Sequence, residues 1–419
     1  MMCLLQQKSP ERKNEFSRQI QFQDAIIETD IHISILGDKK LKFNIHRSII
    51  LPVLTQALET CNTSAKFIDF LVEISKDNIR ITSVNNYAQQ SIEINTKVDV
   101  EEDTVVAFTI IGKNIVDFIR QCHDEELECT YSEKNHALKI ASTTRKMHYV
   151  FMTGNAEEFQ TITFQPGKQG FTIPGMDLCS AFEHTYPATN KENSQRPFTA
   201  VKLLVHHSQL TAESTDRNRI AIYDSEIGDT GIENFEVLIP REVADALSKI
   251  ADNVEYVTIR PCNRHVVFEW DRTEFVTSLE TDEQDEFIAL REFFANPILA
   301  SCRISREDFI RSMKLASLLD NDAEIYVTCS ESGLELRTVE NEVGAGIDTL
   351  SVKEVEGEAT CCLPLKHLLK AVESCDEAWI KVNWSQLDND EVGCGIEDGN
   401  GTVKFYVFPV RSKEYETED

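Results

Sequence analysis

The chain has 419 residues, of which 41% are hydrophobic, and a formal net charge of −29 at pH 7. This length exceeds the size at which a single core usually stops growing, so about two to four domains are expected. No apolar run reaches the roughly 18 to 20 residues that a membrane span needs, which excludes a helical membrane protein, and a charge of this sign, if evenly spread, excludes ordinary nucleic-acid binding.

The first elements follow an N-terminal extension, residues 1–25. The stretch FNIHRSIILPVLTQAL (43–58) places apolar residues on one face of a helix, and LVEISKDNIRITS (71–83) alternates as a strand pair does. A second strand-then-helix pattern, VVAFTIIGKNIVDFIRQC, covers residues 105–122. The alternating segments LECTYSE and ALKIAS after it are typical of half-buried antiparallel strands.

The same order returns twice along the chain. The first pattern recurs as FTIPGMDLCSAFEHTY (171–186) and CRISREDFIRSMKLAS (302–317), and the second as NFEVLIPREVADALSKIA (234–251) and EATCCLPLKHLLKAVESC (358–375). Pro240 and Pro364 share one column, at the first helical turn, where the missing N–H is not needed. Aligned apolar positions predict a shared core, and they are Ile45, Ile173, Ile304; Ile50, Leu178, Phe309; Leu54, Phe182, Met313; Ile110, Ile239, Leu363; Ile115, Ala244, Leu368; and Phe118, Leu247, Ala371.

These repeats predict three copies of one unit, each with two helices and antiparallel strands. We expect domains at residues 26–160, 168–285 and 296–412, followed by an acidic tail, 413–419. The alternative is that three unrelated domains resemble one another by chance. The six predicted helical segments are together close to neutral, so almost all of the negative charge falls on strands, loops and tails.

The three tandem units resemble the bacterial-type DNA sliding clamp, the beta subunit of DNA polymerase III, over residues 26–412. The motifs that carry the resemblance are VLIPREVADAL in the second unit, TDRNRIAIYD before it, and YVFPVR near the C-terminus. The resemblance implies an α+β DNA clamp fold, with three tandem similar domains, each of two helices packed on antiparallel sheets, forming half of a ring. Two subunits of that family close head to tail, and the edge around KMHYVFMT (146–153) is the expected interface.

The resemblance also implies a function. The chain would be a processivity factor, a homodimeric ring that encircles double-stranded DNA without sequence preference, binds the replicative DNA polymerase and the clamp loader, and has no catalytic residue, metal or cofactor. We expect it in the cytoplasm, associated with the nucleoid and not with a membrane. The residues expected to face DNA are Lys113, Arg120, Arg196, Phe198, Arg241, Arg303, Arg311, Lys314 and Lys370, although each charge could equally be an ordinary solvated one.

A client-binding groove between the second and third domains is the second site that the resemblance implies. Its expected residues are Thr199, Thr215, Asn218, Arg219, Ile220, Tyr406, Val407, Phe408, Pro409, Val410 and Arg411. This chain has Arg217-Asn218 where the family commonly has Gly-His, and Tyr406 and Phe408 are larger than the usual aliphatic residues, so the groove could be partly filled. Alternatively, FYVFPV is only a core strand.

Two other functions stay open at this point. A clamp-fold scaffold that no longer encircles DNA would suit the strong acidity, the altered groove and the N-terminal extension. An enzyme with a thiol or metal site is the third alternative, but none of the 12 cysteines is at C-x-x-C spacing. Cys179, Cys302 and Cys329 lie in apolar runs, so buried reduced thiols are the simpler interpretation.

Overall fold

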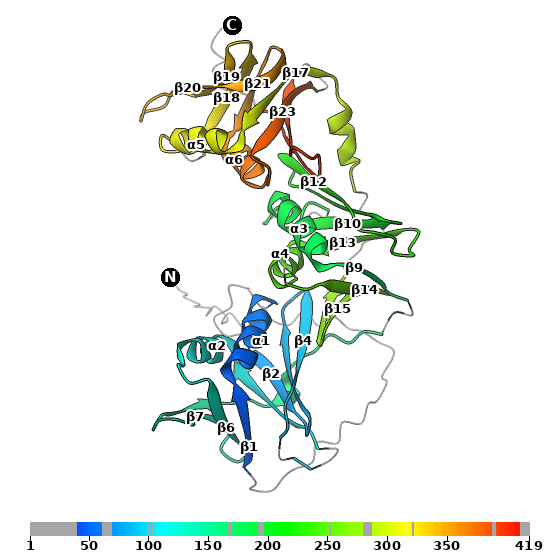
Figure 1. Ribbon diagram of the computed structural model, residues 1–419, viewed down its shortest axis with the longest axis vertical. Helices are drawn as coiled ribbons and strands as arrows, with labels where there is room; N and C mark the ends of the chain where they lie inside the picture. Colours follow the sequence, from blue (N-terminus) through cyan, green and yellow to red (C-terminus); the bar gives the residue numbers. More distant parts are fainter. Residues whose placement is uncertain are drawn as a thin grey trace, which may run out of the picture.

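The computed structural model describes residues 40–60, 69–98, 100–101, 104–165, 167, 169–191, 197–251, 253–279, 287–320, 322–387 and 391–410. Three similar units follow one another within them, as the repeats predict (Figure 1). The expected N-terminal extension, residues 1–25, and the acidic tail, 413–419, lie outside the described residues.

Unit 1 contains two helices, α1 (Arg47–Thr60) and α2 (Gly112–Gln121). Its strands are β1 (Leu41–His46), β2 (Asp69–Ile74), β3 (Asn78–Val84), β4 (Ala88–Asn95), β5 (Val106–Ile111), β6 (Glu126–Ser132), β7 (Ala137–Ser142) and β8 (His148–Met152), and a short 3-10 helix, η1 (Ala156–Glu158), follows them.

Unit 2 contains α3 (Gly175–Thr185), η2 (Tyr186–Ala188) and α4 (Arg241–Ile250). Its strands are β9 (Phe171–Pro174), β10 (Ala200–His206), β11 (Gln209–Thr215), β12 (Arg219–Glu226), β13 (Phe235–Pro240), β14 (Tyr256–Cys262), β15 (His265–Trp270) and β16 (Thr273–Ser278).

Unit 3 contains α5 (Arg306–Ala316) and α6 (Leu365–Glu373), and the 3-10 helix η3 (Leu290–Ala295) precedes it. Its strands are β17 (Ile298–Ser305), β18 (Glu324–Ser330), β19 (Gly333–Thr338), β20 (Ile347–Leu350), β21 (Val352–Gly357), β22 (Ala359–Pro364), β23 (Trp379–Gln386), β24 (Val392–Glu397) and β25 (Val403–Val407).

The first residue of α1, α3 and α5 has the same role in the three units. In each unit the backbone N–H of this residue donates to a carbonyl oxygen just before the strand that follows the second helix. The N···O distance is 2.8 Å for Arg47, 3.1 Å for Gly175 and 3.0 Å for Arg306. In units 1 and 3 the guanidinium also donates to carbonyls in the last turn of the second helix, where the regular i to i+4 hydrogen bonds run out. A Cβ at Gly175 would lie 2.1 Å from the carbonyl oxygen of Val254, so unit 2 has no room for a side chain here.

The second helix of units 2 and 3 begins directly after a proline. Pro240 and Pro364 are the last residues of β13 and β22 and the N-caps of α4 and α6. The prolines therefore lie one position before the helical turn in which the sequence pattern placed them. Their extended backbone, with ψ of 144° and 114°, turns each strand into its helix.

The sheets run across the boundaries between units. An eight-stranded sheet, β5-β2-β3-β4-β16-β15-β14-β9, joins units 1 and 2 through the pair β4–β16, and a nine-stranded sheet, β13-β10-β11-β12-β25-β24-β23-β17-β21, joins units 2 and 3 through β12–β25. Two four-stranded sheets close the ends, β1-β6-β7-β8 in unit 1 and β20-β19-β18-β22 in unit 3. The described chain therefore ends in two outer strands, β8 and β20.

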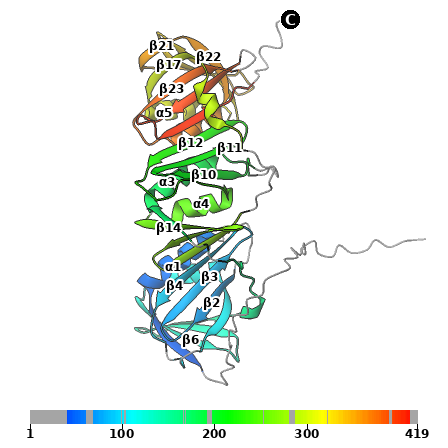
Figure 2. The same ribbon diagram turned by 90° about the vertical axis from the view of Figure 1, so that its right-hand side faces the viewer.

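The molecule is a crescent. Figure 1 shows the helix pairs α1–α2, α3–α4 and α5–α6 along its concave side, and the joined sheets on its convex side. Figure 2 shows the three units stacked in one column. This arrangement agrees with the α+β clamp fold expected from the sequence.

The aligned apolar positions form the cores, as predicted. Ile173, Ile304, Leu178, Phe309 and Ile239 have no exposed surface, and unit 2 and unit 3 share one continuous apolar cluster. Unit 1 has a core of its own. The ten described cysteines are all buried as free thiols, which agrees with the simpler of the two interpretations of the sequence.

Candidate functional site: an aromatic groove and a helix-lined concave face

The residues of the expected groove lie on two strands that are hydrogen-bonded neighbours. β12 of unit 2 pairs antiparallel with β25 of unit 3, and Ile220 stands opposite Tyr406. Both side chains are buried, as is Val407 at the end of β25. The Tyr406 hydroxyl lies 2.8 Å from Ser385 Oγ, and burial raises the pKa of Tyr406. These residues therefore form the floor of the site.

A cluster of aromatic rings covers this floor. Phe408, which follows β25, lies 5.2 Å from Tyr406 between ring centroids. Phe293 of η3 contacts Phe408 edge to face at 5.0 Å, and Phe294 contacts Tyr406 in the same way at 5.7 Å. Such edge-to-face pairs contribute about 0.5–1.5 kcal/mol each beyond buried area. Aromatic side chains of the chain itself thus occupy the place of the expected groove, and we name Phe293, Phe294, Tyr406 and Phe408 the aromatic cluster.

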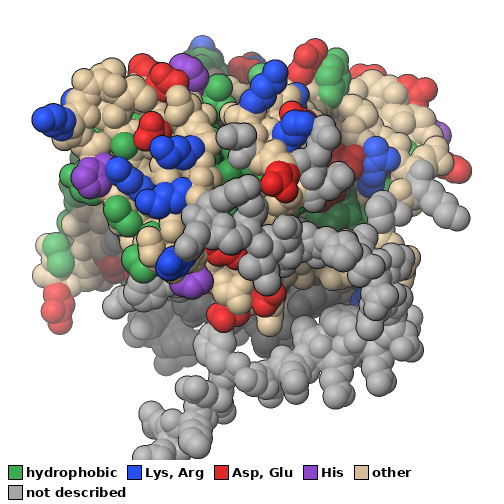
Figure 3. Space-filling view, turned by 90° about the horizontal axis from the view of Figure 1, so that it is seen from below, with side chains coloured by type: hydrophobic (Ala, Val, Ile, Leu, Met, Phe, Trp, Pro, Cys, Tyr) green, Lys and Arg blue, Asp and Glu red, His purple; other side chains and the backbone are tan. Residues whose placement is uncertain are grey.

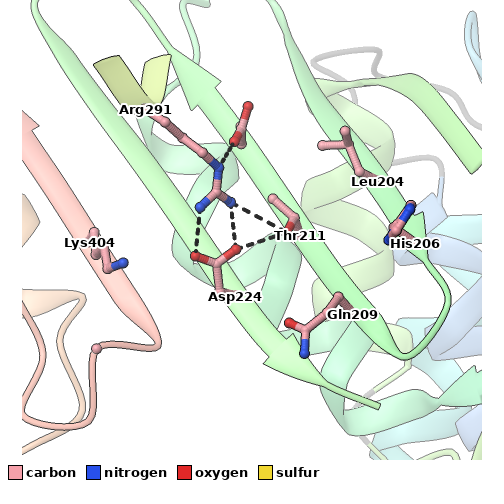
Figure 4. A pocket seen from close by; sticks show the side chains of 9 residues that line it. Leu204, His206, Gln209, Thr211, Asp224, Arg291 and Lys404 are labelled. Atoms are coloured by element: carbon pink, nitrogen blue, oxygen red, sulfur yellow. Dashed lines mark hydrogen bonds and ion pairs between the residues drawn. The ribbon is translucent and has the colours of Figure 1, made fainter. Parts of the chain in front are cut away.

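Arg291 fixes η3 to the sheet beside the aromatic cluster (Figure 4). Its guanidinium donates to both carboxylate oxygens of Asp224, at 3.1 and 2.6 Å, and to Glu213 at 2.8 Å. Thr211 also donates to Asp224, at 2.8 Å. Burial alone would raise the pKa of Asp224, but the hydrogen bonds from Arg291 and Thr211 outweigh it and lower the pKa. The carboxylate is therefore ionised and oriented by Thr211 of β11 and Arg291 of η3.

A shallow pocket of about 490 Å³ opens next to Arg291 on the same face of the sheet. It is lined by Leu204, His206, Gln209, Thr211, Glu213, Asp224, Arg291, Gly401 and Lys404. None of the residues predicted for the groove lines this pocket. The sequence alone does not predict Arg291 at this site, because an isolated arginine in a linker has no periodicity. Its only signal is the run LREFF, which combines a basic residue with two aromatic rings.

The turn between β11 and β12 is organised by Asp216. Its carboxylate accepts the N–H groups of Asn218 and Arg219 and the Arg219 Nε at 3.0 Å. Arg217 has a φ of 76°, a conformation that glycine adopts more easily, and its guanidinium lies 4.2 Å from the Phe198 ring. The arginine that replaces the family's glycine is thus held by a cation–π contact.

The other predicted groove residues surround this turn. Thr215 is buried, and its hydroxyl donates to the Arg219 carbonyl at 2.8 Å, whereas Thr199 accepts the Arg241 N–H at 3.0 Å. Phe408 N–H donates to the Asn218 carbonyl. Pro409 and Val410 are half-buried beyond β25, and Arg411 lies outside the described residues.

The helices of unit 3 carry three of the predicted DNA-facing residues, and all three are exposed and paired with carboxylates. Arg311 contacts Glu307 at 2.7 Å, and Lys314 and Lys370 both contact Glu373, at 3.0 and 2.9 Å. Burial would raise the pKa of Glu373, but the two lysines lower it on balance. Exposed pairs of this kind contribute about 0–1 kcal/mol, so a phosphate can replace the carboxylate.

Unit 1 contributes Lys113 and Arg120 on α2, both exposed. Arg120 contacts Asp117 one turn away, at 3.3 Å. Arg196, predicted to face DNA from unit 2, lies outside the described residues.

Three of the residues expected to face DNA are not exposed helix residues. Arg241 is half-buried and its Nη1 donates to the carbonyls of Tyr186 and Thr189, at 2.7 and 2.8 Å, so it holds η2 in place; burial lowers its pKa. Phe198 is only 7% exposed, beneath Arg217. Arg303 lies on strand β17 and not on a helix, because α5 begins only at Arg306.

Both outer strands of the crescent expose apolar side chains. At the β8 end these are Tyr149, Val150 and Met152, and at the β20 end they are Leu315, Leu318, Val343 and Ile347. Figure 3 looks onto the end of unit 1 and shows Lys, Arg and His side chains gathered on one side. The exposed basic residues of β1, β7, β8 and the turns between them are Lys42, His46, Lys134, His136, Lys139, Arg145, Lys146 and His148, beside the exposed acidic Glu128 and Glu133. In β20 and the loop before it, residues 339–350, the exposed charged residues are the acidic Glu340, Glu342 and Asp348.

Among the residues that the structure describes, no group of three or more metal-ligating side chains is close enough to hold a metal ion. No helix in the same part of the chain is both long and apolar enough to cross a membrane.

A crescent of three repeated units, with paired helices on the concave side of joined sheets, is the architecture of the DNA clamp fold. Residues 172–282 match the family model described as DNA polymerase III beta subunit, central domain. The chain is similar to the beta sliding clamps of Mycoplasma capricolum (19% identical over 351 residues, 82% of this chain and 92% of the relative) and Chlamydia trachomatis (24% over 360 residues, 82% and 80%). The resemblance to bacterial beta sliding clamps predicted from the sequence is thus confirmed.

Solved structures agree on the fold. The DNA polymerase III beta subunit of Thermotoga maritima has a TM-score of 0.78 and 18% identity, covering 89% of this chain and all of that one. The sliding clamp of Bacillus subtilis has a TM-score of 0.77 and 18% identity, with the same coverage. The α+β clamp fold is confirmed.

Proposed function

We propose that this chain is a DNA polymerase processivity factor: two copies close into a ring around duplex DNA, and the groove at the junction of units 2 and 3 binds polymerase and other clients. It performs no chemistry in this role. One observation carries the proposal. The sheets are continuous across both internal junctions, whereas the two ends present outer strands with apolar side chains and opposite charge.

Pairing β8 of one copy with β20 of the other would cover these ends. Tyr149 and Phe151 already pack on Phe118, at 5.0 and 5.1 Å, so the apolar side chains at β8 have a rigid support. Unpaired strand edges promote association, and closure of a twofold ring covers both kinds of edge at once. The basic end of unit 1 and the acidic end of unit 3 favour this head-to-tail order over head-to-head contact.

The charges of the concave face suit sliding. Arg311, Lys314 and Lys370 offer positive charge, but each is shared with a carboxylate, so phosphate contacts are weak and exchange readily. An enclosed duplex would be retained by the ring itself and would meet low barriers to translation. Lys113 and Arg120 add positive charge from unit 1.

Retention on circular and linear DNA tests the proposal. The protein is loaded on nicked plasmid, half of the sample is linearised, and bound protein is separated from free protein at about 0.15 M salt. We expect retention on circles, loss from linear molecules, and a solution mass twice the chain's 47.6 kDa. Equal retention on both DNA forms would contradict topological binding.

A scaffold that no longer encircles DNA is the second candidate, and the net charge of −29 together with the self-filled groove favours it. In that case the same assay would detect no retention on either DNA form, while the protein would still be dimeric or bind protein partners.

A further inference from the structure

The segment Leu290–Phe294 occupies the candidate groove with three kinds of contact. Leu290 is buried to 2% exposure against Ile220, Ile222 and Tyr406, and Phe293 and Phe294 join the same apolar cluster. Arg291 is bound by Asp224 and Glu213. A single short segment thus places one basic group and two rings on a surface made by β12 and β25.

The receptor for Arg291 is built from rigid elements. Glu213 and Asp224 lie on neighbouring strands, β11 and β12, and their side chains are only 9% and 24% exposed. Thr211 orients Asp224 from the adjacent strand. Removing the guanidinium would leave two partly buried carboxylates with only the more distant charge of Lys404 near them, which is unfavourable. Whatever replaces η3 on this surface must therefore supply positive charge.

The segment itself is held by side chains more than by its own helical structure. η3 has six residues, and its N-cap, Ala289, makes no side-chain cap hydrogen bond. Arg291 is half exposed at the rim of the pocket of about 490 Å³, so solvent reaches its contacts with Asp224 from one side. A competing peptide has access to the same carboxylates.

We propose that residues 290–294 are an internal ligand of the groove, and that the clients of this groove carry a basic residue followed, two and three positions later, by aromatic residues. Such a client takes the place of η3: its basic side chain binds Asp224 and Glu213, and its rings pack on Tyr406 and Phe408. The inference rests on the proposed function only in that it treats the groove as the client site.

A peptide of residues 289–296, ALREFFAN, labelled with a fluorophore, tests this by fluorescence anisotropy. The triple variant Arg291→Ala, Phe293→Ala, Phe294→Ala in the full chain should bind the peptide at least tenfold more tightly than the wild type, because its own segment no longer competes. Glu292→Ala changes an exposed residue of the same helix and should bind the peptide with the affinity of the wild type.

The chemistry of recognition is tested with a second peptide in which glutamate replaces the arginine. We expect at least tenfold weaker binding of it to the triple variant. Equal affinity of wild type and triple variant for the first peptide, or indifference to the arginine, would overturn the inference. If the triple variant does not fold, the single variant Arg291→Ala should still bind the first peptide at least threefold more tightly than the wild type. The absence of that increase in affinity would equally overturn the inference.

Plasmid retention of the wild-type protein separates the two conclusions. Retention on circles with no peptide effect would leave the clamp function standing and refute the internal ligand. Peptide binding without retention on circles would support the internal ligand and refute the clamp function.

Discussion

Arg47 and Arg306 make the same contact 259 positions apart: each begins the first helix of its unit, and its guanidinium donates to two carbonyls at the end of the second helix, with Nε distances of 3.1 Å in both. The contact ties the two helices of a unit together. It also neutralises the negative end of the second helix dipole.

Loss of this contact should destabilise the fold locally. We expect Arg306→Ala to lower the free energy of unfolding by about 1.5–3 kcal/mol, since hydrogen bonds to charged groups contribute about this much. Arg311→Ala, in the same helix but exposed, should change it by only about 0–1 kcal/mol. Denaturant unfolding followed by circular dichroism measures both, and equal effects would refute the special role of Arg306.

The outer strands should control assembly. Ile347→Arg places a positive charge on β20, where a second copy would bring the basic β8 end, so we expect a monomer by light scattering at micromolar concentration. Met176→Arg changes an equally exposed apolar residue on α3 and should leave the mass unchanged. A dimeric Ile347→Arg variant would show that β20 lies outside the interface.

The concave face should control DNA retention. Arg311→Glu combined with Lys314→Glu adds repulsion of the phosphates, and we expect loading or retention on circular plasmid to fall several-fold, with a shallower salt dependence. Arg264→Glu with Arg272→Glu makes the same charge change at the two ends of β15, away from the helices, and serves as the control. If the two double variants behave alike, net charge and not the helix surface governs binding.

The groove should depend on Phe408. Truncation to alanine removes a ring that contacts both Phe293 and Tyr406, so we expect client-peptide affinity to fall about tenfold, and further when residues 409–411 are also deleted. The dimer mass should not change, because Phe408 packs at the junction of units 2 and 3, whereas β8 and β20 belong to the two end sheets. Unchanged anisotropy titrations would remove Phe408 from the site.

Acid should weaken the junction between units 2 and 3. Burial and the charge of Arg219 lower the pKa of His367, although Asp216, 4.0 Å away, opposes them, and Lys366 adds to the lowering. In the unfolded chain His367 therefore binds a proton from about pH 6.5 downward, whereas in the folded chain its imidazole stays neutral to lower pH. The stability that the neutral imidazole permits above pH 6.5 is lost as the pH falls below it.

His367→Gln should therefore reduce the loss of stability between pH 7.5 and 5.5, measured by thermal unfolding. His265, whose pKa burial also lowers, remains in this variant and keeps part of the pH dependence. An unchanged slope would show that His367 does not titrate in this window.

The repeats predicted the fold because they are local patterns. Strand-to-helix segments at three places have buried positions that follow from their spacing alone, as Ile239 and Leu363 illustrate. Phe118, in the same alignment as the buried Leu247, is only partly buried because its unit ends at the outer strand β8. That difference depends on the position of a unit in the crescent, which no local pattern records.

The sites were less predictable because long-range packing decides them. Arg241 has the spacing of an exposed helix residue, yet η2 folds over it and takes its hydrogen bonds. Phe198 is expected near DNA because it matches by position an aromatic residue of the clamp family, although the turn at Arg217 covers it. The position of Phe293 and Phe294 in the groove depends on how a linker crosses the sheet, which its composition does not encode.

The unbroken sheets also say where such an assembly opens. At each internal junction of one chain, strands β4 and β16 or β12 and β25 share a hydrogen-bonded ladder and a covalent connection. Opening the assembly to admit DNA would break fewer bonds if two copies separated than if one copy bent at an internal junction. In the proposed ring the gate would therefore be the seam between chains, and each crescent would move through loading as a stiff half.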